Sequence, residues 1–265
     1  MNFALALLIG LELSVSPFDD AVKRFEEQAF TYTGGDTKTQ KFAYRLLRPE
    51  QLEAGKKYPV VLFLHGAGER GDDNKSQLKY LPHWLSEPES RAKYPCFLIA
   101  PQCPSDKKWV EVSWDSAVSQ DRPPEPGDQM KVVIGILNEV MKEHRVDDRR
   151  VYLTGLSMGG YGSWDLAMRL PERFAAVAPV CGGGDEQGAD LLKDVPIWAW
   201  HGDADNAVPV ARSRGMIEAI KKAGGSPKYS ELKGVGHDSW TPAYTDPKGV
   251  VPWMFQQSRE SASEK

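Results

Sequence analysis

Ser157 stands at the centre of a Gly-Leu-Ser-Met-Gly run over residues 155–159. A β-branched and apolar segment, 151–156, precedes it, and a helix-compatible segment, 161–170, follows it. A serine between a strand and a helix in a Gly-x-Ser-x-Gly run is typical of a nucleophile elbow. The glycines suit the sharp turn, because side chains there would keep the strand and the helix apart. The run therefore predicts that Ser157 is a nucleophile, which would make the chain a hydrolase or an acyl transferase.

A serine hydroxyl is a weak nucleophile and needs a base within hydrogen-bond reach, usually a histidine oriented by a carboxylate. Among the five histidines, His237 follows a predicted strand and lies in a glycine-flanked loop. His65 and His201 begin glycine-containing loops, and we expect them to hold the geometry of those loops. His83 and His144 fall on helical segments, where we expect surface or packing roles. The sequence therefore predicts His237 as the general base.

The carboxylate that orients the base has more than one candidate. Asp203 and Asp205 both lie between Ser157 and His237 in the chain, just before a helix whose first turn holds Pro209. We favour Asp205 on its position in the motif, which gives the order nucleophile, acid, base. Either aspartate could instead stabilise the loop or cap the helix. Two weaker alternatives follow the preceding strand: Asp185 and Asp190.

An acyl-transfer site also needs two backbone N–H groups that stabilise the oxyanion of the tetrahedral intermediate. One is expected from Met158, the residue after the nucleophile. The other is expected from the loop after strand 58–64, with Ala67 as the first choice and Gly66 or Gly68 as alternatives. A simple flexible turn would explain the same glycines, but the loop lies opposite the elbow in the expected fold.

These residues must be positioned by an alternation of strands and helices. We expect strands at 28–33, 40–48, 58–64, 96–100, 151–156, 174–180, 195–200 and 227–232, and helices at 128–145, 161–170, 209–223 and 250–258. Such alternation predicts an α/β fold, a three-layer sandwich whose central sheet has about eight mostly parallel strands. We expect no large cap domain. Ligands bind at the carboxyl ends of the strands in such sheets, and the candidate residues directly follow four of them.

Composition limits the class of protein. The 265 residues carry a net charge of −4, with 41% hydrophobic and 26% charged residues. This balance disfavours nucleic-acid partners and fits one globular catalytic domain, expected at 17–258 and followed by a polar tail at 259–265. The apolar run 3–11 is too short to span a bilayer, so we expect no stable membrane insertion.

The same apolar run favours a signal peptide at 1–16, which would make the protein secreted or periplasmic. A cytoplasmic protein with a buried or disordered N-terminal segment is the alternative, because basic residues are missing before the run. The three cysteines do not form a disulfide framework, and we expect buried free thiols. The sequence does not fix the oligomeric state.

Four motifs together resemble a known family. Their sequences are Leu-His-Gly-Ala-Gly-Glu-Arg-Gly at 64–71, Gly-Leu-Ser-Met-Gly-Gly at 155–160, His-Gly-Asp-Ala-Asp-Asn-Ala-Val-Pro at 201–209 and Gly-His at 236–237. They resemble the α/β-hydrolase superfamily over residues 40–258, and within it the phospholipase/carboxylesterase and dienelactone-hydrolase-like group. That group includes esterases related to feruloyl esterases and polyhydroxybutyrate depolymerases, and secreted proteins described as predicted peptidases.

The resemblance implies carboxylic ester hydrolysis through an acyl-enzyme, with no metal and no organic cofactor. It implies catalytic roles for Ser157, Asp205 and His237, and oxyanion roles for Ala67 and Met158. A serine peptidase of the same fold and a catalytically inactive binding protein are the alternatives. We expect the partner to be a small-molecule or polymer-linked ester.

Three tryptophans are candidates for the substrate pocket. Trp109 and Trp114 lie in the long Pro-rich segment 102–127, which follows a predicted strand, and Trp240 lies three residues after His237. Aromatic side chains there would line an acyl or sugar-binding cleft, or they would anchor the long segment to the core. An open cleft would suit aryl or polysaccharide-linked esters, such as feruloyl or acetyl esters.

Overall fold

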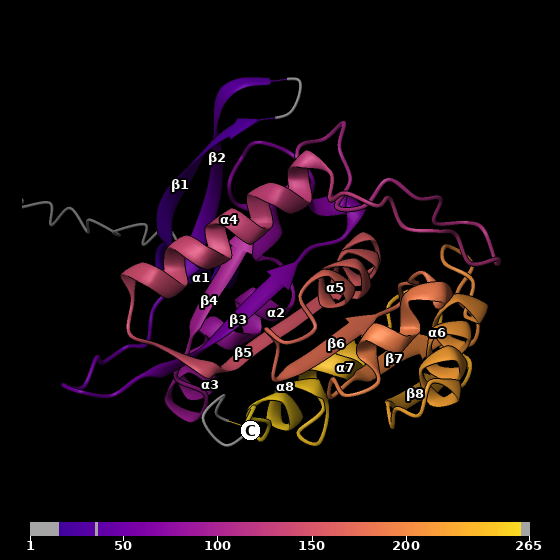
Figure 1. The fold of residues 1–265 in the computed structure, drawn as a ribbon. Helices are drawn as coiled ribbons and strands as arrows, with labels where there is room; N and C mark the ends of the chain where they lie inside the picture. Colours follow the sequence, from indigo (N-terminus) through magenta and orange to yellow (C-terminus); the bar gives the residue numbers. More distant parts are fainter. Residues whose placement is uncertain (1–15, 35–36, 261–265) are drawn as a thin grey trace, which may run out of the picture.

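The chain builds an eight-stranded sheet in which the strands lie in the order β1-β2-β4-β3-β5-β6-β7-β8 (Figure 1). The computed structural model describes residues 16–34 and 37–260. The strands are β1 Glu26–Gly34, β2 Thr37–Leu47, β3 Tyr58–Leu64, β4 Phe97–Pro101, β5 Val146–Leu156, β6 Ala176–Val180, β7 Trp198–Gly202 and β8 Lys228–Leu232. Pairing is antiparallel at β1/β2 and β2/β4 and parallel from β4 to β8. The sheet is open, and the expected α/β architecture is confirmed.

Helices cover both faces of this sheet (Figure 1). They are α1 Pro17–Lys23, α2 Leu81–Ser86, α3 Pro88–Lys93, α4 Asp128–Glu143, α5 Met158–Arg169, α6 Ala211–Lys222, α7 Trp240–Thr245 and α8 Val250–Met254. Residues of α4, α5 and α6 pack on one face, and residues of α1, α2, α7 and α8 pack on the other. Three short 3-10 turns lie between them, at Ala67–Glu69, Ser76–Leu78 and Glu186–Leu192.

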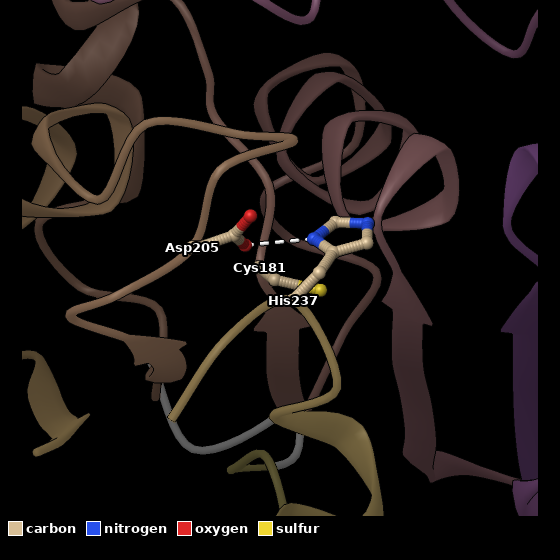
Figure 2. A group of neighbouring side chains, drawn as sticks. All are labelled: Cys181, Asp205 and His237. Carbon is tan, nitrogen blue, oxygen red and sulfur yellow. Dashed lines mark hydrogen bonds and ion pairs between the residues drawn. The ribbon is translucent and has the colours of Figure 1, made fainter. Parts of the chain in front are cut away.

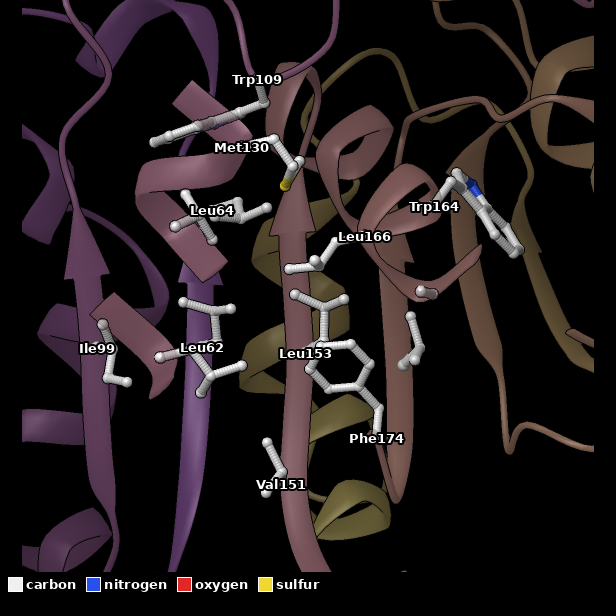
Figure 3. Packing of buried hydrophobic residues seen from close by; sticks show 14 of the residues in the cluster. Leu62, Leu64, Ile99, Trp109, Met130, Val151, Leu153, Trp164, Leu166 and Phe174 are labelled. Atoms are coloured by element: carbon white, nitrogen blue, oxygen red, sulfur yellow. The ribbon is translucent and has the colours of Figure 1, made fainter. Parts of the chain in front are cut away.

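Strand β3 shows how the two faces are separated. All seven of its residues are buried. Leu62 and Leu64 join the cluster that contains Leu166 of α5 and Leu153 of β5 (Figure 3), while Phe63 joins the cluster on the opposite face. Side chains alternate across a strand, so a strand covered on both faces reads as a continuous apolar run. Because β3 is buried on both faces, it fixes the position from which the following loop starts at His65.

The structure changes several expected boundaries. Strand β5 begins at Val146 and not at 151, and α5 begins directly after Ser157. Helix α2 contains His83, which was expected on a helical segment, whereas α1, α3 and α7 were not expected; they have only six or seven residues, too few to show a helical repeat. The final helix ends at Met254, before the expected 258.

Some expectations fall outside the described residues. The apolar run 3–11 and nearly all of the expected signal peptide 1–16 lie there, as do residues 261–265 of the expected tail. In the described part of the chain, no helix has both the length and the hydrophobicity needed to cross a bilayer. Cys96, Cys103 and Cys181 are free and buried.

Candidate active site

The turn between β5 and α5 presents Ser157 in a strained conformation. Its φ of 55° and ψ of −118° are rarely adopted by a residue with a side chain. A Cβ on Gly159 would overlap the carbonyl oxygen of Leu64, so only glycine lets α5 approach β3 this closely. The backbone N–H of Ser157 donates to Val180 of β6 at 2.9 Å. The turn is therefore fixed from both neighbouring strands, as an elbow requires.

Ser157, His237 and Asp205 form a continuous hydrogen-bond chain at the carboxyl edge of the sheet. Ser157 Oγ lies 2.9 Å from His237 Nε2, and His237 Nδ1 lies 2.7 Å from Asp205 Oδ2. A carboxylate can only accept, so Nδ1 carries a proton and Nε2 is free to accept the serine proton. The structure thus brings together three side chains that are 32 and 80 residues apart in the sequence.

The carboxyl group of Asp205 is completely buried, and its loop supplies the donors that keep it charged. Oδ1 accepts from the backbone N–H of Ala207 at 2.8 Å and of Val208 at 2.9 Å. Burial alone would raise the pKa of Asp205. Hydrogen bonds from His201, His237 and these two N–H groups outweigh burial and hold the pKa below its usual range.

Two of the other candidate acids, Asp203 and Asp185, are used elsewhere. Asp203 Oδ1 accepts from the N–H of Gly234 at 2.6 Å and so ties two loops together. Asp185 caps the turn Glu186–Leu192 by accepting from Gln187. His201 is buried, with Nε2 at 3.2 Å from Asp205 Oδ2 and Nδ1 at 2.8 Å from Ser213 Oγ. It supports the acid loop, in the place that the sequence suggested.

The loop after β3 is held by His65. The backbone N–H of Cys103 donates to His65 Nε2 at 2.9 Å, which leaves Nδ1 protonated to donate to the Gly66 carbonyl at 2.6 Å. This fixes the peptide plane between Gly66 and Ala67, because its C=O and N–H point in opposite directions. Burial lowers the pKa of His65 to about 4, so the ring stays neutral at neutral pH.

Trp109 does not line the pocket that the sequence analysis assigned to it. Its side chain is 2% exposed, and its indole N–H donates to the His65 carbonyl at 3.0 Å. Trp109 therefore anchors the segment 102–127 to the loop that carries Ala67. The sequence analysis gave this anchoring role as the alternative to pocket lining, and the sequence pattern alone could not distinguish the two roles.

Met158 follows Ser157 in the chain, and Ala67 lines the same pocket as Ser157. Met158 is the first residue of α5, where helix N–H groups lack intrahelical partners and the helix dipole is positive. Ala67 begins a short turn and lines the pocket beside Ser157. Across residues 16–34 and 37–260, neither backbone N–H donates to another protein group. Two N–H groups are therefore free to bind a ligand oxygen.

A pocket of about 380 Å³ opens over Ser157 and His237. Three aromatic side chains line it, and we call them the aromatic rim: Tyr80, Trp114 and Trp240. Trp114 and Trp240 were expected there, whereas Tyr80 was not. No local pattern marks Tyr80, because it reaches the pocket through a backbone φ of 62° at the start of α2. The buried side chain of Glu69 also lines the pocket and was missed, although it stands inside the motif at 64–71.

Cys181 lies beneath Asp205 and His237 (Figure 2). One ligand atom from each of the three lies within 4.8 Å of the others, which is close enough to hold a metal ion. Burial raises the pKa of the Cys181 thiol, however, and a thiol must lose its proton to bind a metal. His237 and Asp205 already bind each other. The donor set therefore suits a proton relay better than a metal ion.

Comparison with known proteins places this geometry in a family. A model of the phospholipase/carboxylesterase family matches residues 51–246, which include every residue of the hydrogen-bond chain. The chain belongs to this family. In structure, it is similar to a thermostable esterase, with 37% identity and a TM-score of 0.79 over 90% of this chain and 64% of the other. A ferulic acid esterase from Anaeromyces mucronatus shares the fold, at 17% identity and a TM-score of 0.56 over 81% of this chain and 85% of the other.

Two curated relatives have esterase names. The chain is 26% identical to a bifunctional acetylxylan esterase/xylanase from Neocallimastix patriciarum, over 66% of this chain and 23% of the relative. It is 26% identical to a probable feruloyl esterase C from Aspergillus niger, over 74% of this chain and 67% of the relative. The chain thus spans about a quarter of the first relative's length.

Proposed function

We propose that the protein is a serine carboxylesterase that works through an acyl-enzyme. Ser157 attacks the ester carbonyl, and His237 accepts the serine proton and then delivers it to the departing alcohol. In the second half of the reaction, water attacks the carbonyl of the acyl-enzyme while His237 accepts a proton from the water. His237 then returns this proton to Ser157 Oγ as the acid is released. Asp205 holds the imidazole in the required tautomer and stabilises its charged form. The observation that carries the proposal is the hydrogen-bond chain from Ser157 Oγ through His237 to Asp205.

The oxyanion of the tetrahedral intermediate binds the N–H groups of Ala67 and Met158 in this proposal. Their freedom from protein acceptors in the described residues supports it. So does His65, which fixes the Gly66–Ala67 peptide before substrate arrives. Such preorganised donors stabilise charge without rearrangement during the reaction.

The proposed substrates are aryl or polysaccharide-linked esters, of feruloyl or acetyl type. The open pocket with its aromatic rim supports this class, as does similarity to a probable feruloyl esterase and an acetylxylan esterase/xylanase. We further propose that residues 17–258 form the catalytic domain and that the protein acts outside the cytoplasm. Similarity to an uncharacterized secreted protein of Arthroderma benhamiae, 23% identical over 84% of this chain, supports the location.

Covalent labelling combined with ester hydrolysis tests the function. Wild-type protein should react with a fluorophosphonate at Ser157 and hydrolyse 4-nitrophenyl acetate, methyl ferulate or acetylated xylan. Ser157→Ala should lose labelling and lose at least about 10³-fold in kcat while keeping its fold. Ser163→Ala is the matched control, because Ser163 lies on the same helix and its hydroxyl donates to the Gly159 carbonyl.

The alternatives give different results in the same assays. A folded wild-type protein that does not label would be a binding protein of this fold. A protein that labels but cleaves 4-nitroanilide amides faster than the matching esters would be a peptidase. Fractionation of the native host, with detection of the protein in the medium or periplasm, tests the proposed location.

A further inference from the structure

Glu69 is a buried acid in the wall of the pocket that the proposed mechanism does not use. The residue is 6% exposed and lines the same pocket as Ser157. In the described part of the chain, no basic side chain lies within ion-pair distance of its carboxyl group. Burial raises the pKa of Glu69, against the opposing effects of Lys79 and of backbone N–H groups at Gly66 and Glu69. A buried carboxyl without a charged partner is costly unless further donors reach it.

The carboxyl group of Glu69 lies beside Gly66 and Leu156. A Cβ built on Gly66 would lie 3.1 Å from Glu69 Oε2 and would also meet the side chain of Leu156. Gly66 and Leu156 line the pocket, and Leu156 directly precedes Ser157. The acceptor oxygens of Glu69 are therefore near the position at which an ester would bind.

Two aromatic rings extend this part of the pocket. The ring centroids of Tyr80 and Trp240 are 5.4 Å apart, and Trp240 meets the His237 ring edge-on at 5.3 Å. The backbone of Tyr80 is held at a φ of 62°, a costly conformation for a residue with a side chain. Strain of this kind persists where surrounding structure enforces it, and such sites are often functional.

The position of Trp240 identifies which half of the ester binds here. His237 must deliver its proton to the departing alcohol oxygen, so the alcohol part binds on the His237 side of the oxyanion donors. Trp240 packs against His237, and Tyr80 packs against Trp240. Trp114 lines the same pocket but, among the described residues, makes no ring contact with His237, Tyr80 or Trp240, so we assign the acyl part to it.

We propose that Glu69, Tyr80 and Trp240 form the subsite for the alcohol part of the ester and that this part is a hydroxylated ring such as a sugar. The ring packs its C–H face on the aromatic side chains, and a hydroxyl beside the ester donates to Glu69. This combination of apolar faces and one placed acceptor is characteristic of a site that selects orientation. The inference rests on the proposed esterase function and defines which alcohols it releases.

A pair of substrates tests the subsite. One is a mono-O-acetyl methyl xyloside with a free hydroxyl beside the ester, and the other is the same compound with that hydroxyl methylated. Wild-type protein should prefer the first by at least about tenfold in kcat/KM, as expected for a hydrogen bond to a charged group. Glu69→Gln should reduce this ratio mainly through KM. Glu111→Gln is the control, since Glu111 is exposed and does not line this pocket.

A second measurement does not depend on any variant. Free methyl xyloside should inhibit wild-type hydrolysis of 4-nitrophenyl acetate competitively, and its permethylated form should inhibit at least about tenfold more weakly. A wild-type ratio near one, or an equal loss for both substrates in Glu69→Gln, would assign Glu69 to the loop structure and overturn the subsite. If folded wild-type protein hydrolyses neither the sugar acetates nor 4-nitrophenyl acetate, the esterase function fails as well.

Discussion

The hydrogen-bond chain and the aromatic rim meet in one pocket but are held in place by different forces. Asp205, His237 and Ser157 are fixed by directional hydrogen bonds of 2.7 to 2.9 Å. The rim is fixed by ring packing and by cations over Trp114, with Lys108 Nζ at 4.8 Å and Arg70 Cζ at 5.7 Å from its centroid. Directional bonds tolerate little displacement, whereas packed rings accept substitution by others of similar size. We therefore expect substitutions in the hydrogen-bond chain to lower kcat, and substitutions in the aromatic rim to change substrate selectivity with much less effect on kcat.

The largest effect should follow loss of the charge on the acid. Asp205→Asn changes the hydrogen-bond donor pattern beside His237 and favours the wrong tautomer, so kcat should fall by about 10³- to 10⁴-fold. Asp203→Asn keeps an acceptor for the Gly234 N–H and should retain most activity. Steady-state hydrolysis of 4-nitrophenyl acetate measures both variants. Equal losses in the two would show that the loop as a whole, and not one carboxylate, matters.

A methyl group in the elbow should disturb the hydrogen-bond chain through the backbone. In Gly159→Ala, the new Cβ overlaps the Leu64 carbonyl, and neither backbone can move away easily. The free energy of unfolding should fall by about 3 kcal/mol or more. Gly127→Ala is the control, since a Cβ there meets nothing within 4 Å. Urea denaturation of both variants would contradict this account if they lost the same stability.

Acid should weaken the protein through His65. Its pKa is about 4 in the folded protein and near its ordinary value of 6.5 in the unfolded chain. Between these values the unfolded chain binds the proton and the folded one does not, so stability falls as the pH decreases from about 6.5 to 4. The contribution is at most about 3 kcal/mol.

Comparison with His65→Asn isolates this contribution. The variant lacks the titrating ring, so the stability difference from wild type should be greatest above pH 6.5 and narrow as the pH falls to 4. Denaturation midpoints at several pH values provide the measurement. A difference that stays constant over this range would mean that His65 is not kept neutral by burial.

The smallest effect should come from the rim on the acyl side. Trp114→Leu removes the ring over which Lys108 and Arg70 lie, and KM for methyl ferulate should rise about tenfold, as loss of an aromatic contact predicts. The kcat for 4-nitrophenyl acetate should change much less than in Asp205→Asn. Trp253→Leu, a substitution in α8 that does not touch the lining of this pocket, is the matched control for loss of an indole. A kcat loss as large as that of Asp205→Asn would contradict the separation between rim and hydrogen-bond chain.

The two regions also differ in how far the sequence predicts them. Ser157, Asp205 and His237 each follow a strand, and parallel strands bring their carboxyl ends to one edge, so their proximity follows from topology. Tyr80 depends on an unusual backbone angle and Glu69 on burial by residues far away in the chain. Neither property leaves a local pattern.

Trp109 is the converse case, because the sequence assigned it to the pocket and the structure places it elsewhere. An indole in a long loop suits a pocket or an anchor equally well, and only the contact with His65 separates them. The α/β class and the succession of strands along the chain were predictable from alternation, while the short helices α3 and α7 were not.

The segment 102–127 contacts the loop that carries Ala67 and also contributes Trp114 to the lining of the pocket. The backbone N–H of Cys103 donates to the His65 ring, and the indole N–H of Trp109 donates to the His65 carbonyl. The Trp114 carbonyl accepts a hydrogen bond from Tyr161, on the helix after Ser157. We therefore expect an exchange of the entire segment between relatives to alter the pocket at Trp114 and to disturb the loop that carries Ala67 at the same time. Replacement of residues 115–127 alone would leave the contacts of Cys103, Trp109 and Trp114 in place, which makes this part the natural target for grafting or library design.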